Sequence, residues 1–214
     1  MQLKGPHKKT NETSADRKPD SAVTGNAEPV TFKSSAMSNL VLSGLSVALI
    51  AVMAQIAIPL PSGVPLTLST LAIVLVGIVF GPKQASLIVM LYLLLGAVGI
   101  PVFASFSGGL EALLGPAGGF LYSFPLLALS ASAGMKAAMV TGQKWALWLG
   151  LGLGTIVNYT IGVWHYAYFT GTSLPAAISA AVLPFVIGDI LKLIVAGILG
   201  QRIKTLLYYQ PSAS

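Results

Sequence analysis

Charged side chains are scarce in this sequence, and their scarcity excludes an ordinary soluble fold. Asp, Glu, Lys and Arg make up 8% of the 214 residues, while hydrophobic residues make up 55%. A soluble domain carries about 25% charged residues. From Met37 to the end, the only acids are Glu111 and Asp189. That part of the chain therefore suits a lipid bilayer better than water.

Cysteine is absent, and histidine occurs only as His7 and His165. Without cysteine the chain has no disulfide bonds and no thiolate metal sites. Two histidines cannot form a histidine metal cluster, and the two distant acids do not suggest a catalytic carboxylate pair. The net charge of +6 comes without a basic stripe carrying interleaved aromatic residues, so it does not indicate a nucleic-acid partner. We expect neither an enzyme nor a bound cofactor.

Residues 1–36 differ in composition from the rest of the chain. They contain four of the six acids and six of the twelve bases, and they have almost no large apolar side chains. Such a segment cannot bury enough surface to offset the entropy lost on ordering. We therefore expect a disordered polar tail over residues 1–36, followed by a membrane domain over residues 37–214.

Apolar segments separated by Pro and Gly predict an all-α, polytopic membrane protein with six transmembrane helices. A membrane helix needs about 20 apolar residues, and fewer when it is packed inside a bundle. The predicted helices span residues 38–58, 64–80, 84–100, 118–140, 145–169 and 184–207. Residues 174–183 are too few to span alone and predict either a surface helix or an extension of the sixth helix before a kink at Pro184.

Lys and Arg are distributed unequally between the two sides of this predicted bundle. If the N-terminus is cytoplasmic, the outer loops at 59–63, 101–117 and 170–183 contain neither residue type. The cytoplasmic side then holds Lys33, Lys83, Lys136, Lys144, Arg202 and Lys204. This is the positive-inside pattern, and it predicts a multi-pass protein of the cell membrane with both termini in the cytoplasm.

Asp189 and Lys192 lie inside the apolar run FVIGDILKLIVAG. Their i, i+3 spacing places them on one helical face, where they can touch. A lone charge at the bilayer centre costs about 3 kcal/mol even by the lower estimates, so such residues normally face a cavity and pair. A pure packing role is the alternative, but apolar groups often replace buried ion pairs without loss. We favour a binding role, with Asp189 accepting from a ligand N–H and Lys192 donating to a ligand oxygen.

Other polar side chains also fall within predicted helices, among them Tyr92, Asn158 and Tyr159. A buried amide or phenol needs a hydrogen-bond partner. That partner is either a neighbouring helix or a ligand in a pocket, and the sequence leaves both open. Small residues at Gly44, Ala48, Ala51 and Ala54 follow one face of the first helix, which predicts either packing within the bundle or docking to a partner membrane subunit.

The connection FASFSGGLEALLGPAGGF, residues 103–120, is rich in glycine. Glycine lets backbone approach a ligand closely, and irregular backbone at membrane depth is tolerated where it lines a cavity or is buried in protein. We expect this segment to form a lid or wall over an outward-facing pocket, with a plain connecting loop as the alternative. It is not a phosphate loop, because the closing Gly-Lys-Ser/Thr is missing.

Four stretches resemble the BioY family, the biotin-specific S-components of energy-coupling factor transporters. They are QIAIPLPSGVPLTLSTLA at 55–72, LYLLLGAVGIPVFASFSGGLEALLGPAGGF at 91–120, the segment Tyr159–Gly162, and LPFVIGDILK at 183–192. The resemblance implies a six-helix protein that binds biotin with high affinity from outside and works with a transmembrane coupling subunit and ABC-type ATPases. It also implies that Asp189 and Lys192 contact the ligand, next to the glycine-rich loop.

The chain departs from the family pattern at several positions. Ala117 and Phe120 stand where many relatives have Thr and Tyr, Ser69 stands where many have Gln, and no arginine lies near Ser107. Lys192 is then the only cation expected deep in the pocket, where it meets either the biotin carboxylate or the ureido carbonyl. The expected substrate-binding residues are Tyr92, Ser107, Gly108, Gly115, Gly118, Gly119, Asn158, Tyr159, Asp189 and Lys192. The alternative functions are an S-component for another vitamin and a solitary biotin facilitator.

Overall fold

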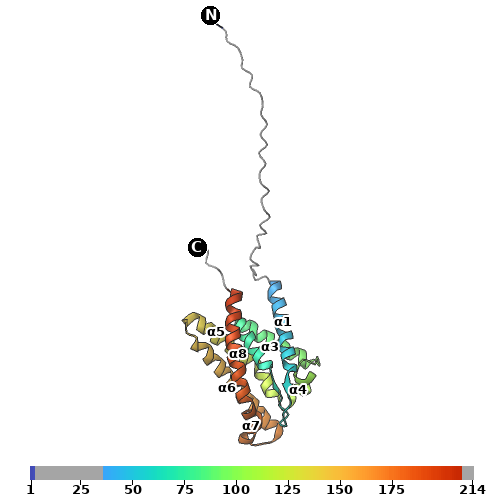
Figure 1. Ribbon diagram of the computed structural model, residues 1–214. Coiled ribbons are helices and arrows are strands. Elements are labelled where there is room, and N and C mark those ends of the chain that lie inside the picture. Colours follow the sequence, from blue (N-terminus) through green and yellow to red (C-terminus); the bar gives the residue numbers. More distant parts are fainter. Residues whose placement is uncertain (3–35, 209–214) are drawn as a thin grey trace. The chain divides into compact units, whose positions relative to one another are not determined.

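The computed structural model describes residues 1–2 and 36–208. The chain divides into two units, Met1–Lys33 and Ser34–Ser214. The helices and strands of the described residues all belong to the second unit (Figure 1). The polar tail predicted to be disordered lies almost wholly outside the described residues.

Six helices form the body of the second unit, as the sequence predicts. They are α1 (Ala36–Gln55), α2 (Ser69–Val79), α3 (Pro82–Ala97), α5 (Gly118–Thr141), α6 (Trp145–Thr170) and α8 (Leu183–Tyr208). Shorter elements connect them: strands β1 (Ala57–Ile58) and β2 (Leu66–Thr67), the 3-10 turn η1 (Ala104–Phe106), and helices α4 (Leu110–Leu114) and α7 (Leu174–Ala181). The separate α7 decides between the two predictions for residues 174–183: residues 174–181 form a helix distinct from α8, which begins at Leu183.

Helix α2 is shorter than the predicted span of 64–80. Its 11 residues reach about 17 Å at 1.5 Å per residue, against a hydrocarbon core of about 30 Å. Residues before it are extended because β2 pairs antiparallel with β1, with Ile58 opposite Leu66. Prolines at 59, 61 and 65 cannot donate a helical hydrogen bond. The predicted helices at 38–58 and 64–80 were therefore wrong where they meet this hairpin.

The shortness of α2 is compatible with a membrane because the helix lies inside the bundle. Ala72, Ile73, Val74 and Ile78 are fully buried, and α2 packs against α8, α5 and α1. By length and composition, α1, α5, α6 and α8 are the helices able to cross a bilayer among the described residues. Three of these, α1, α5 and α8, pack directly against α2, so a helix too short to span alone is accommodated within protein.

Hydrogen bonds hold together the end of the bundle where α1 begins and α8 finishes (Figure 1). Gln84 of α3 donates to Ser43 of α1 at 3.2 Å, and Lys204 of α8 donates to the carbonyl of Ile78 at the end of α2 at 3.0 Å. Four further cations lie in or beside helix ends on the same side: Lys83, Lys136, Lys144 and Arg202. The structure thus gathers these cations at one end.

The most extensive helix pair is α5 against α6, and glycine makes it close. A Cβ atom added at Gly150 would lie 2.7 Å from the Cα of Gly134 and 2.7 Å from the carbonyl oxygen of Ser130. Contacts of this kind need small residues on both helices, because membrane helices associate largely through packing.

Gly150→Ala should therefore lower the melting temperature of the purified protein in detergent, since two backbones must separate at a cost of about 1–3 kcal/mol. Gly152→Ala is the matched control on the same helix, because a Cβ there meets nothing within 4 Å. The Gly152→Ala variant gains the same helix propensity as Gly150→Ala but introduces no steric clash between α5 and α6. Equal melting temperatures for the two variants would contradict the close α5–α6 contact.

Candidate functional site

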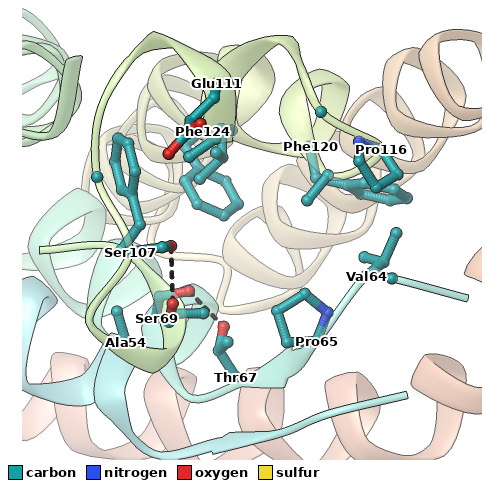
Figure 2. A pocket seen from close by; sticks show the side chains of 18 of the residues that line it. Ala54, Val64, Pro65, Thr67, Ser69, Ser107, Glu111, Pro116, Phe120 and Phe124 are labelled. Carbon is teal, nitrogen blue, oxygen red and sulfur yellow. Dashed lines mark hydrogen bonds between the residues drawn. The ribbon is translucent and has the colours of Figure 1, made fainter. Parts of the chain in front are cut away.

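A cavity of about 450 Å³ opens at the end of the bundle remote from the cations. Its volume lies within the range of about 300–1,000 Å³ that small-molecule sites occupy. The walls come from the β hairpin, from the loop between α3 and α5, and from the first turns of α5 (Figure 2). Most of the lining is apolar, and the aromatic side chains of Tyr92, Phe103, Phe120 and Phe124 are its largest.

Hydroxyl groups on the cavity wall are already paired within the protein. Thr67 and Ser69 share a hydrogen bond of 2.6 Å, and Figure 2 shows them on the wall opposite Phe124 and Glu111. The Tyr92 hydroxyl donates to the carbonyl of Val102 at 3.2 Å. The wall therefore presents few free donors to a ligand.

A smaller recess adjoins this cavity and contains the buried ion pair. It shares Val64, Pro65, Thr67, Phe120 and Phe124 with the cavity. Lys192 Nζ lies 2.8 Å from Asp189 Oδ1, and the two side chains are only 9% and 13% exposed. Tyr159 of α6 donates its hydroxyl to the other carboxylate oxygen, Oδ2, at 2.6 Å. The structure thus brings Asp189, Lys192 and Tyr159 into one network.

Asn158 and Thr70 complete the polar side of the recess. Asn158 Nδ2 donates to the carbonyl of Phe120 at 3.1 Å and to Ser123 Oγ at 2.7 Å, so this amide both joins α6 to α5 and lines the recess. The buried hydroxyl oxygen of Thr70 has no hydrogen-bond partner among the described residues. A buried hydroxyl without a partner costs about 1–3 kcal/mol, so Thr70 is suited to bond a polar ligand atom.

The glycines of the loop serve two different purposes. Gly108 and Gly115 line the cavity together with Ser107. Gly118 and Gly119, predicted as binding residues, are not among its lining residues and lie where α5 begins against other parts of the chain. A Cβ at Gly118 would lie 1.7 Å from the carbonyl oxygen of Leu113, and one at Gly119 would lie 2.4 Å from the Cβ of His165. These two glycines permit close packing beside the site.

Two residues outside the predicted set hold the cavity loop in place. Gln55, at the end of α1, donates to the carbonyl of Phe103 at 3.1 Å and accepts from the N–H of Phe106 at 2.8 Å. Ser105 and Phe106 both have φ of 56°, a left-handed conformation uncommon outside glycine. His165 Nε2 lies 2.9 Å from the carbonyl oxygen of Gly115. The sequence feature that could have pointed to Gln55 is a single amide side chain at the end of an otherwise apolar helix.

Comparisons with known proteins identify relatives of the chain and of its fold. The family model described as "BioY family" matches residues 24–209. The "Biotin transporter BioY" of Thermotoga maritima is 41% identical, covering 79% of this chain and 98% of its own. The "Biotin transporter BioY" of Rhodobacter capsulatus is 34% identical, covering 82% and 96%. A crystal structure of "the S-component for biotin from an ECF-type ABC transporter" aligns with a TM-score of 0.70 and 25% identity, covering 82% of this chain and 97% of that one.

Gln55→Leu should loosen the loop over residues 102–107, because the left-handed turn then loses its hydrogen bonds to α1. Amide hydrogen exchange of peptides from that loop should quicken by roughly tenfold, the equivalent of about 1.4 kcal/mol of lost hydrogen bonding. Gln201→Leu is the control, since the Gln201 amide donates to Gly197 within its own helix. Unchanged exchange in Gln55→Leu would show that other contacts hold the loop.

Proposed function

We propose that this chain, which belongs to the BioY family, captures biotin as the S-component of a membrane vitamin transporter. The family model and the relatives confirm the resemblance predicted from the sequence, and the family consists of transporter components rather than enzymes. The observation that carries the proposal is the Asp189–Lys192 pair, almost fully buried beside an apolar cavity of suitable size.

The charge balance of the recess favours the ureido head of biotin as its occupant. Asp189 and Lys192 neutralise each other at 2.8 Å. A carboxylate placed there would add an unbalanced buried charge, which is strongly unfavourable. A ureido group is neutral and carries both N–H donors and a carbonyl acceptor. Asp189 then accepts from a ligand N–H, and Lys192 donates to the ureido oxygen.

The remaining walls suit the rest of the same ligand. Phe120 and Phe124 line both the recess and the larger cavity, so they flank the path from one to the other. An apolar fused ring system packs favourably against such aromatic faces. Thr70 offers its unpartnered hydroxyl beside the head group. The acidic tail then extends into the large cavity.

Asp189→Asn should weaken biotin binding to the purified protein by at least about tenfold, since the variant loses a charge-assisted hydrogen bond worth roughly 1.5–3 kcal/mol. Tyr159→Phe should weaken it about fivefold by freeing one carboxylate oxygen from its partner. Isothermal titration calorimetry measures both. Tyr168→Phe, on the same helix but 89% exposed, should bind as the unmodified chain does. Unchanged affinity in Asp189→Asn would refute the assignment.

The partners proposed for transport are a transmembrane coupling subunit and ABC-type ATPases. Support comes from α1, whose small residues fall into two groups. Ala54 is buried and lines the cavity, whereas Gly44 and Ala48 are exposed, and a Cβ at Gly44 meets nothing within 4 Å. The exposed pair lets another membrane helix approach closely, so we assign it to the coupling subunit.

We also propose that the cation-rich end faces the cytoplasm and that the cavity opens outward from the cell membrane. Helices α1 and α8 place the first and last described turns of this unit at the cation-rich end (Figure 1). Cytoplasmic loops of membrane proteins are enriched in Lys and Arg. A ligand taken up from outside would then meet the cavity directly.

Because the chain has no cysteine, single introduced cysteines report this orientation without background. Thr172→Cys, between α6 and α7, should react with a membrane-impermeant maleimide in intact cells. Gln143→Cys, between α5 and α6, should react only after the cells are permeabilised. The opposite labelling pattern would reverse the proposed orientation.

A further inference from the structure

The large cavity has a single charged side chain on its wall. Glu111, in the first turn of α4, is exposed, and Figure 2 shows it across from Thr67 and Ser69. No Lys, Arg or His is among the described residues that line this cavity. Glu111 does not line the recess that contains Asp189 and Lys192, so it belongs to the other end of the site.

Several groups that could replace a cation at that end are already engaged. The hydroxyl of Ser107 donates to the carbonyl of Ala104 at 2.8 Å. The N–H groups of Gly115 and Gly118 donate to the carbonyls of Glu111 and Gly115. A tail carboxylate therefore meets a like charge with no cation beside it in the described cavity lining, while an ammonium group there meets an opposite charge.

We propose that Glu111 makes this end of the site selective for ligands that share the ureido bicycle of biotin but end in an uncharged or cationic amide. The same side chain weakens binding of the free acid. The inference rests on the proposed function, because only a head group bound at Asp189 and Lys192 directs the tail towards Glu111. The ligand class is an amide of biotin with an amine, for example with a diamine or with the side chain of lysine.

The exposure of Glu111 sets the size of the effect. Water and salt screen an exposed charge, and exposed pairs contribute about 0–1 kcal/mol. The discrimination due to Glu111 is therefore roughly two- to fivefold at low ionic strength, and it should shrink as salt is added.

The test measures the dissociation constants of three ligands with the full-length purified chain: biotin, its primary amide, and its amide with ethylenediamine, which carries an ammonium group. Glu111→Gln should bind biotin roughly two- to fivefold more tightly, leave the neutral amide unchanged within error, and bind the cationic amide more weakly. Glu111→Lys should reverse the order and favour the acid. Leu110→Gln, an exposed neighbour outside the cavity lining, should change none of the three.

The diagnostic quantity is the ratio of the acid and amide dissociation constants, compared between the unmodified chain and each variant, as in a double-mutant cycle. A ratio that Glu111→Gln and Glu111→Lys leave unchanged overturns the proposal while the biotin assignment stands. A chain that binds none of the three ligands overturns the biotin assignment as well. A collapse of the ratio in Glu111→Gln together with its reversal in Glu111→Lys supports the proposal.

Discussion

Two opposite charges that must remain paired away from water organise this protein. Asp189 and Lys192 stand one helical turn apart on α8 with little exposure, and either alone would cost several kcal/mol. Satisfying the second carboxylate oxygen needs Tyr159 from α6. Side chains of α2, α6 and α8 thus meet in the recess, to which the short helix α2 contributes Thr70. This buried pair lines the recess to which we assign the head group of the ligand.

The parts of the structure that depend on local sequence were predictable. Apolar runs bounded by Pro and Gly located six helices, and the i, i+3 spacing placed Asp189 beside Lys192. The hairpin of β1 and β2 was missed because residues 64–68 are as apolar as a helix, and only the prolines and the pairing with β1 keep them extended. Hydropathy therefore located the helices but not the ends of the first two.

Contacts between segments distant in the sequence could not be predicted from the sequence pattern alone. The bond from Tyr159 to Asp189 joins residues 30 positions apart, and two interpretations of Tyr159 were open until helices α6 and α8 were placed. Glycine shows the same limit: Gly108 and Gly115 line the cavity, whereas Gly118 and Gly119 relieve crowding at the start of α5. All four residues are glycines, and the two roles are distinguished only by the atoms that a Cβ at each position would contact.

Gln55 connects the two regions to which we assign partner docking and ligand binding. It is the last residue of α1, the helix with the exposed small residues Gly44 and Ala48, and its amide bonds to the loop that walls the cavity. A partner that shifts α1 against this loop must break those bonds, and a ligand that orders the loop must strengthen them. Thermodynamic linkage then requires reciprocity: the factor by which a ligand alters affinity for the partner equals the factor by which the partner alters affinity for the ligand. Through this one amide side chain, the ligand-free and ligand-bound forms of the protein can differ in their affinity for a partner subunit.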